Sequence, residues 1–414
     1  MENKRSPEIR FLGFTGEWEQ RKIGDHAEIL TGGTPKTQIK EYWEPSEIPW
    51  MSSGEVNKKR LSSTDNMISI LGFKNSSARW VKENSILIAL AGQGKTRGTV
   101  AINEIPLTTN QSIAAIVPKE ELHYEFVFQS LEKRYEELRL ISSGDGTRGG
   151  LNKQLVADVV IISPSIAEQF KIGNFFKQLD DMIALHQKEL TTLKQTKQGF
   201  LQKMFPKEGE SVPEVRFPGF TGDWEECKLG DIGKFKNGMN FDKNAMEHGH
   251  PFVNLQDIFG RNIVDNSNLG FAESSENQRK EYNLKKGDIL FIRSSVKPEG
   301  VGEAALVPKD LKDTTYSGFI IRFRPTIEMD NQFKRFIFGT KSIRKQILSH
   351  STSSANTNIN QKALEKIKIK IPLCEEQKEI GGFFRNLDNT IALHQRELDA
   401  LKETKKAFLQ KMFV

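Results

Sequence analysis

The sequence predicts a mixed α/β fold in which two similar domains are separated by a pair of long antiparallel coiled-coil helices, as a pseudo-twofold internal repeat. The opening segment from Pro7 to Glu19 returns from Pro213 to Glu225. The stretch from Glu168 to Phe205 returns from Glu376 to Phe413, with 25 of 38 positions identical. A chain of 414 residues is also too long for a single hydrophobic core. Because the sequence between the copies differs, we expect one constant scaffold that carries two dissimilar inserts.

The repeated tails predict the two helices. Residues of the helix seam follow an unbroken 3-4 spacing from Phe176 to Met204 and again from Phe384 to Met412. Ser165 with Glu168 fits a capping box at the start of the first helix. We expect this helix to be roughly 50 Å long and to pack antiparallel on its repeat copy.

Four seam positions are polar. They are His186 and Lys197 in the first helix, and His394 and Lys405 in the second. Polar seam residues often fix the register of a coiled coil, and long lysine side chains can reach solvent from such positions. We therefore expect a register role with the charged groups in water.

The segments that precede each helix alternate between strand-like and helix-like patterns. Short helices are expected over Leu122–Leu140 and Asn331–Leu348. Apolar runs typical of strands are Ser85–Leu90, Ser112–Val117 and Ala157–Ile162 in the first domain, and Asp288–Ile292, Gly318–Phe323 and Lys366–Ile371 in the second. Their conserved order along the chain predicts one fold for both domains, with different loops.

Composition limits the class of protein. The net charge is +6, which fits a nucleic-acid partner without requiring one. The two cysteines, Cys227 and Cys374, have no counterparts in the other copy, so a disulfide framework is not expected. The sequence holds no apolar run of the roughly 18 residues that a membrane span needs, and its N-terminus has no apolar signal segment. We expect a cytoplasmic protein without a membrane partner.

Three pairs of polar loops, five of the six containing glycine, occupy matched places in the two domains. Arginine, asparagine, glutamine and threonine side chains in such loops suit the donors and acceptors of base edges. Ordinary surface loops have a similar composition, but the recurrence at matched places favours a binding role. The pairs are Thr31–Thr37 with Lys236–Lys243, Ala89–Thr96 with Arg293–Gly300, and Ser142–Gly150 with His350–Asn358.

The loop before Thr96 also matches a loose phosphate-loop pattern that ends in Lys95 and Thr96. A phosphate loop must open a helix, whose first amides hold the phosphates. The residues from Arg97 to Pro106 predict a turn and another strand, and the second domain lacks the pattern. A DNA phosphate or base edge is the better ligand for this basic loop.

Catalytic and metal-binding patterns are missing from the sequence. His248 and His250 are the only close histidine pair, and no cysteine or acidic partner stands at a metal-ligand spacing. No nucleophile elbow or glycine-rich methyl-donor loop occurs. We expect neither a catalytic residue nor a metal site.

Together these segments resemble the specificity subunit of type I restriction-modification enzymes. The shared elements are the Gly-Phe-Thr-Gly-(Glu/Asp)-Trp-Glu openings, Leu151-Asn152 with Ile359-Asn360, and the Glu-Gln pairs at 168–169 and 376–377. The resemblance covers nearly the whole chain. It implies target-recognition domains over residues 1–163 and 209–371, a central spacer helix over 164–208 and a C-terminal spacer helix over 372–414.

The resemblance also implies a function and partners. Each domain would recognise one half of a split site in double-stranded DNA, and the chain itself would not be an enzyme. Two methyltransferase (M) subunits and motor-nuclease (R) subunits would join it. S-adenosylmethionine would sit on the methyltransferase, with no cofactor on this chain.

The loop comparison selects the candidate DNA-binding residues. They are Thr34, Lys36, Gln93, Lys95, Thr96, Arg97 and Arg148 in the first domain, and Asn240, Lys243, Arg293, Ser294, Lys297, Asn356 and Asn358 in the second. Two alternatives stay open at this point, a nucleotide-binding enzyme with coiled-coil arms and a coiled-coil scaffold that does not touch DNA. The repeat further predicts that Phe413 lies beside the opening segment at Pro7.

Overall fold

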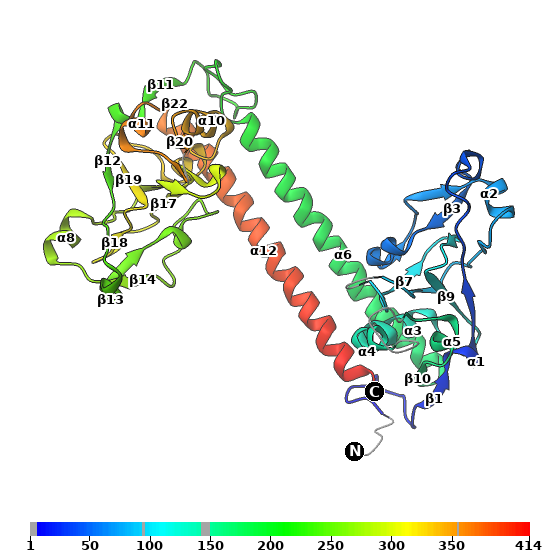
Figure 1. Cartoon of the computed structure of the whole chain (residues 1–414). Helices are drawn as coiled ribbons and strands as arrows, with labels where there is room; N and C mark the ends of the chain where they lie inside the picture. The colour runs from blue at the N-terminus through cyan, green and yellow to red at the C-terminus, as the bar shows by residue number, and fades with distance from the viewer. Residues whose placement is uncertain (1–5, 93–95, 142–149, 354–355) are drawn as a thin grey trace. The chain divides into compact units, whose positions relative to one another are not determined.

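The computed structural model describes residues 6–92, 96–141, 150–353 and 356–414. The chain forms two compact units, Met1–Gln187 with Arg396–Val414 (unit 1), and Lys188–Gln395 (unit 2). Two long helices, α6 (Ile166–Lys203) and α12 (Cys374–Met412), contribute to both units (Figure 1). At 38 residues, α6 is about 57 Å long. The predicted mixed α/β fold with two long helices is confirmed.

Unit 1 is built on a five-stranded sheet, in the order β2-β9-β6-β7-β4. A three-stranded sheet, β5-β3-β8, and the pair β1-β10 complete its strands in the part of the chain described. The strands are β1 (Glu19–Lys22), β2 (Ala27–Thr31), β3 (Ile48–Met51), β4 (Arg60–Leu61), β5 (Asn66–Ile68), β6 (Ile86–Ala89), β7 (Val100–Asn103), β8 (Thr108–Thr109), β9 (Ile113–Pro118) and β10 (Val160–Ser163). The helices are α1 (Ile23–His26), α2 (Ile70–Lys74), α3 (Tyr124–Lys133), α4 (Tyr135–Leu140) and α5 (Lys153–Ala157), with 3-10 turns η1 (Lys40–Tyr42) and η2 (Ser53–Lys58).

Unit 2 repeats this plan with a four-stranded sheet, β12-β19-β15-β17, a three-stranded sheet, β14-β13-β18, and the pair β11-β22. Three short strands within the loops of this unit form a further small sheet, β16-β21-β20. The strands are β11 (Glu225–Lys228), β12 (Gly233–Asn237), β13 (Met246–Val253), β14 (Gly270–Ala272), β15 (Ile289–Ile292), β16 (Ser294–Ser295), β17 (Ala304–Leu306), β18 (Thr315–Tyr316), β19 (Ile320–Pro325), β20 (Thr352–Ser353), β21 (Thr357–Asn358) and β22 (Lys368–Ile371). The helices are α7 (Leu229–Ile232), α8 (Glu276–Glu281), α9 (Asn331–Ile337), α10 (Lys341–Ser349) and α11 (Gln361–Glu365), with 3-10 turns η3 (Lys243–Ala245), η4 (Leu255–Asp257) and η5 (Pro298–Gly300).

The expected helices and strands formed with shifted ends. The helix predicted over Leu122–Leu140 breaks at Arg134, whose backbone leaves the helical region at ψ 17°. The helix predicted over Asn331–Leu348 breaks before Thr340, which takes an extended conformation and caps α10. Ala157, predicted to begin a strand, is instead the last residue of α5, a helix whose N-terminus is capped by Asn152. The strand therefore starts later, at Val160.

In each unit, the first part of one long helix packs against the last part of the other. In unit 1, Ile172 and Phe176 of α6 share a core with Phe408 and Met412 of α12. In unit 2, Phe200 and Met204 of α6 share a core with residues of α12 that include Phe384. These contacts require an antiparallel helix pair in each unit, as the repeat predicted.

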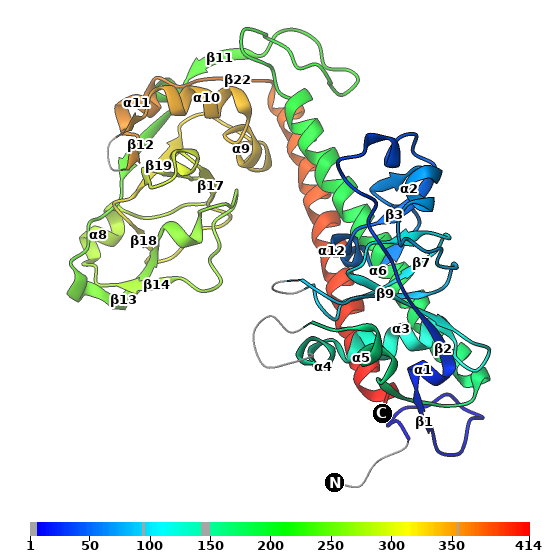
Figure 2. The same ribbon diagram turned by 45° about the vertical axis from the view of Figure 1, so that its right-hand side comes forward.

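The opening segments fasten the helix ends. The backbone N–H of Ile9 donates to the carbonyl of Lys411 at 3.0 Å, and the N–H of Val215 donates to the carbonyl of Lys203 at 2.9 Å. Phe413 packs edge-on against Trp18 with ring centroids 6.5 Å apart. Figure 2 shows the C-terminus beside the opening segment. The prediction that Phe413 lies beside the first opening segment is confirmed.

The glutamates and glutamines at the helix starts have matched partners. Arg10 donates two hydrogen bonds, of 2.6 and 2.7 Å, to the buried Glu168, the residue predicted to form a capping box. Arg216 makes the same pair of bonds, both 2.7 Å, to Glu376. Gln169 accepts the N–H of His123 at 2.9 Å. The repeated glutamates therefore join the opening segments to the helices.

Two of the polar seam residues differ from expectation. The ammonium of Lys405 is only 13% exposed and pairs with Glu132 and Asp180 at 2.6 and 2.7 Å. Burial opposes its charge, but these two carboxylates raise the pKa of Lys405. Lys197 pairs with Asp388 at 2.5 Å in unit 2. The lysines thus form ion pairs with acids instead of reaching into water, because each seam brings an aspartate of the partner helix beside them.

Candidate functional site

In unit 1, several loops meet at one end of the five-stranded sheet. The N–H of Gly33 donates to the carbonyl of Thr109 at 2.9 Å. The N–H of Leu90 donates to the carbonyl of Ser112 at 2.8 Å, and Leu90 in turn accepts the N–H of Leu151 at 3.0 Å. We call the described residues 32–36, 90–92, 96–98, 109–112 and 150–152 the loop edge of unit 1.

Unit 2 repeats these backbone bonds with different residues. The N–H of Met239 donates to the carbonyl of Tyr316 at 2.8 Å. The N–H of Arg293 donates to the carbonyl of Phe319 at 2.8 Å, and Arg293 accepts the N–H of Ile359 at 2.9 Å. The loop edge of unit 2 comprises residues 238–243, 293–297, 317–319 and 356–360. The same backbone scaffold thus presents two sets of side chains.

The loop edge of unit 1 contains four of the predicted residues. The hydroxyl of Thr34 donates to the side-chain oxygen of Gln111 at 2.6 Å. Lys36 is exposed, while its carbonyl accepts the indole N–H of Trp43 at 3.3 Å. Thr96 and Arg97 are half-buried in the turn before β7. The remaining predictions, Gln93, Lys95 and Arg148, lie outside the described residues.

The predicted residues of unit 2 come together more fully. Arg293 donates from Nη1 to the carbonyl of Gly318 at 3.3 Å. Ser294 pairs with Asn358 in the small sheet, and the Asn358 amide donates to the carbonyl of Asn356 at 2.9 Å. The rest of this edge has Asn240, Asn356 and Lys297 exposed, and the backbone of Lys243 begins η3.

Three residues of the loop edges were not predicted from the sequence. Gln111 orients Thr34, and the polar run from Thr108 to Ser112 between two strands could have revealed it. Phe319 is 56% exposed and Val296 is 81% exposed. In a sequence, an apolar residue next to a buried strand looks like a residue of the hydrophobic core. Only the structure shows that Phe319 and Val296 are exposed.

A buried tyrosine supports the edge of unit 2. The hydroxyl of Tyr316 donates to the carbonyl of Lys236 at 3.2 Å. Burial raises the pKa of Tyr316 well above its ordinary value, so the hydroxyl stays a neutral donor at physiological pH. This bond ties the loop that carries Asn240 to the strand that precedes Phe319.

The turn before β7 argues against a nucleotide site in unit 1. A phosphate loop needs a helix directly after its lysine. Here the N–H of Gly98 donates to the carbonyl of Ala89 at 2.9 Å, and strand β7 begins at Val100. The expected turn and strand are therefore confirmed in the described part of this loop.

One histidine of the close pair in unit 2 contacts protein groups, and the other lines a cavity. His248 lies 3.0 Å from Glu273 through Nε2 and 2.9 Å from the carbonyl of Met246 through Nδ1. His250 lines an open polar cavity of about 580 Å³ together with Glu273 and Asn240. This hollow adjoins the loop edge and widens the polar surface around Asn240.

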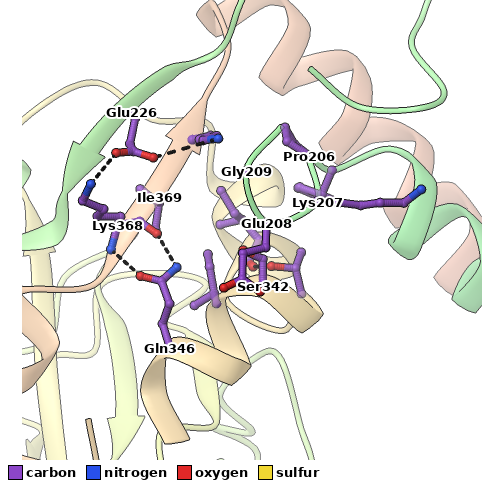
Figure 3. A pocket seen from close by; sticks show the side chains of 14 residues that line it. Pro206, Lys207, Glu208, Gly209, Glu226, Ser342, Gln346, Lys368 and Ile369 are labelled. Carbon is purple, nitrogen blue, oxygen red and sulfur yellow. Dashed lines mark hydrogen bonds and ion pairs between the residues drawn. The ribbon is translucent and has the colours of Figure 1, made fainter. Parts of the chain in front are cut away.

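A cavity of about 280 Å³ lies between the linker after α6, helix α10 and strand β22 (Figure 3). Gln346 exchanges two hydrogen bonds of 2.9 Å with the backbone of Lys368. Lys368 pairs with Glu226 at 2.7 Å, and Lys345 pairs with Glu208 at 2.6 Å. Since these polar groups bond to one another, we assign the cavity to the junction of linker and domain.

Comparison with known proteins identifies the family. A family model described as "Type I restriction modification DNA specificity domain" matches residues 15–195 and, a second time, residues 221–403. The chain belongs to this family. It carries two DNA specificity domains, so this specificity chain is a recognition subunit and not a catalytic one.

Relatives of the specificity chain align over most of its length. The MjaIX specificity subunit of Methanocaldococcus jannaschii is 26% identical, over 96% of this chain and 92% of the relative. The EcoKI specificity subunit of Escherichia coli K12 is 21% identical, over 88% of this chain and 80% of the relative. The solved S subunit from M. genitalium shares the fold, with a TM-score of 0.62 at 15% identity and 99% of both chains covered. A second solved structure, described as the structural basis of complex assembly of the type I R-M system, has a TM-score of 0.53. Its chain is 15% identical, over 96% of this chain and 97% of that one.

A search of the described residues for helices long and apolar enough to cross a membrane finds none in the specificity chain.

Proposed function

We propose that this chain directs a type I restriction-modification complex to a bipartite site in double-stranded DNA, with each loop edge recognising one half. The observation that carries the proposal is the repeated loop edge. Matched backbone bonds hold it in both units, while its side chains differ from Thr34 and Gln111 to Asn240 and Arg293. A constant scaffold with different polar side chains suits recognition of two different sequences.

The edge residues supply both kinds of DNA contact. The guanidinium of Arg293 can donate to guanine O6 and N7, and the amide of Asn240 can pair with adenine N6 and N7. Lys36 and Lys297, both exposed, suit phosphates and would fix the position of the domain on the duplex. Further DNA contacts are proposed for the edge residues Thr96, Arg97, Lys243, Ser294, Asn356 and Asn358. Gln93, Lys95 and Arg148, outside the described residues, stay proposed from the sequence alone.

The proposed partners follow from family membership. Two methyltransferase subunits would bind this chain, and motor-nuclease subunits would join the complex for cleavage. S-adenosylmethionine would bind the methyltransferase and not this chain. The work on complex assembly in a related system supports such partners, and we propose a cytoplasmic location for the complex.

The long helices are proposed as the spacer between target-recognition domains 1–163 and 209–371. Insertion of one heptad in both helices adds about 10 Å, or about 3 base pairs of duplex. Methylome sequencing of cells with the extended chain should show half-sites moved apart by that amount. Unchanged spacing would contradict the spacer role and leave recognition by the edges standing.

The function itself is tested by methylome sequencing of host cells with and without this chain. We expect a split methylated motif that disappears when the chain is deleted and returns with the wild-type chain. A scaffold that does not touch DNA would leave no motif dependent on this chain. The substitution Arg293→Ala should alter or weaken methylation at one half-site, whereas Arg385→Ala, at an exposed position of α12 that belongs to neither loop edge, should not.

A further inference from the structure

Two exposed apolar side chains stand in the loop edge of unit 2, together with exposed polar residues such as Asn240 and Lys297. Phe319 is 56% exposed, although its neighbours Gly318 and Ile320 are buried. Val296 is 81% exposed. A phenylalanine in water forgoes the free energy of burial, so its place in a proposed binding edge favours an apolar partner.

The backbone of Phe319 is fixed before any ligand arrives. Its carbonyl accepts the N–H of Arg293 at 2.8 Å, and its N–H donates to the hydroxyl of Ser317 at 3.3 Å. The N–H of Gly318 donates to the carbonyl of Met239 at 2.6 Å. An aromatic ring on an ordered backbone loses little conformational freedom on binding.

Base-contacting groups lie beside this ring. A Cβ atom at Gly318 would lie 2.1 Å from the side-chain oxygen of Asn240, so the absence of a side chain lets Asn240 approach. The guanidinium of Arg293 reaches the carbonyl of Gly318 at 3.3 Å. An amide, a guanidinium and a phenyl ring are therefore grouped around Gly318.

We propose, resting on the proposed function, that Phe319 recognises the C5-methyl group of a thymine in the half-site bound by unit 2. The thymine methyl is the apolar feature that base pairs present in the major groove. Its neighbours there are the hydrogen-bonding edges that Asn240 and Arg293 suit. Val296, three residues after Arg293, is a second exposed apolar side chain of the same loop edge.

Unit 1 lacks this apolar contact. The carbonyl that accepts the Leu90 N–H belongs to Ser112, so Ser112 takes the place of Phe319, and Leu90 takes the place of Arg293. Leu90 is only 7% exposed, and the polar Gln111 is held by Thr34. Dependence on a thymine methyl through this position is therefore confined to the half-site of unit 2.

The test uses the full chain assembled with its methyltransferase subunits and a duplex that contains its methylated motif. Each thymine of the unit 2 half-site is replaced in turn by deoxyuridine, which removes only the methyl group. The dissociation constant is measured at one fixed salt concentration, because salt changes DNA affinity strongly. The protein variants are Phe319→Ser, Phe319→Leu and the control Ile327→Ser, which changes a 40% exposed side chain beyond the other end of β19, about 20 Å away.

At one position, deoxyuridine should weaken binding by the wild-type complex about 4-fold, the value of one buried methyl group. Phe319→Ser should bind the thymine duplex more weakly and show no further loss with deoxyuridine there. Phe319→Leu should keep part of the dependence, and Ile327→Ser all of it.

Three outcomes separate the hypotheses. If Phe319→Ser lowered the affinity equally for the thymine and the deoxyuridine duplex, the ring would act by inserting between bases. That result would overturn methyl recognition. A unit 2 half-site without an A·T pair would also overturn it. Failure of the wild-type complex to prefer its motif over random DNA would instead overturn the proposed function.

Discussion

Unit 1 and unit 2 use the same backbone bonds at their loop edges and at their helix ends, yet few edge side chains agree. The ion pair of Arg10 with Glu168 is equivalent to that of Arg216 with Glu376. The backbone bonds to the carbonyls of Lys411 and Lys203 are likewise equivalent. At the edges, Ser112 stands where unit 2 has Phe319. The difference indicates that contacts with the long helices constrain the scaffold, whereas the side chains of the loop edge vary between the units.

The ion pairs between domain and helix give a second comparison. Asp180 accepts Arg60 from β4 at 3.1 Å, and Arg60 stacks 5.6 Å from the ring of Phe128. In unit 2, Asp388 accepts Arg335 at 2.7 Å. Phe126 and Phe333 hold equivalent places against Phe413 and Phe205, which sets Arg335 at the position of Phe128. A cation beside the aspartate is kept even though a different element supplies it.

The largest expected effect comes from the phenylalanines that close each unit. Phe413 contacts Trp18, Phe126 and Phe176, and Phe205 has the equivalent contacts in unit 2. Phe413→Ala and Phe205→Ala should each lower the free energy of unfolding of their own unit by about 3–5 kcal/mol, since each leaves a cavity in a packed aromatic cluster.

Urea unfolding of the purified chain measures both losses. Leu185→Ala, at a 54% exposed position of α6, is the control and should change stability by less than about 0.5 kcal/mol. A loss in only one of the two phenylalanine variants would show that the units are not closed in the same way.

The next effect concerns the charged cluster at Asp180. Asp180→Ala leaves Arg60 and Lys405 without this carboxylate at 16% and 13% exposure, which should cost about 3 kcal/mol. The neighbouring Asp181 is 53% exposed and pairs with Lys177 within the helix, so Asp181→Ala should cost at most about 0.5 kcal/mol. Equal unfolding midpoints for the two variants would contradict a structural role of the cluster.

A smaller effect distinguishes the units by pH. Burial lowers the pKa of Lys334 to about 8 although Asp288 and Asp330 oppose the shift. The unfolded chain therefore binds more protons than the folded chain between about pH 8 and the ordinary lysine pKa of 10.5, so unit 2 should gain stability as pH rises through this window. With screening, we expect a gain of about 1–2 kcal/mol.

The substitution Lys334→Met isolates this contribution. The difference in unfolding free energy between wild type and Lys334→Met should change across the window, while each chain's other titrations cancel. Unit 1 has Val127, which does not titrate, at the equivalent place, so its stability should show no matching dependence on pH. A pH-independent difference would contradict the assignment to Lys334.

Much of the scaffold could be predicted because the repeat exposes it twice. The 3-4 spacing identified both long helices, and the Asn152 and Asn360 positions proved to be matched helix caps. Helix breaks at Arg134 and Thr340 were missed, since tertiary contacts and a local cap outweigh continuous helical patterns there. The lysines of the seam were expected in solvent, because a sequence does not show which acids lie across a helix pair.

The candidate site was only partly predictable. Polar loops marked Asn240, Arg293 and Asn358, and the structure brings them to one edge. The exposure of Phe319 was not predicted, because it depends on the geometry of the turn between β18 and β19. Sequence periodicity does not encode that geometry.

We propose that each unit recognises one half of the target independently of the other unit. Residues 1–163 are replaced by the corresponding segment of another member of the family, and the methylome of cells with the exchanged chain is sequenced. We predict a motif in which one half changes while the other half and the spacing stay as in wild type. A change in both halves would contradict the account.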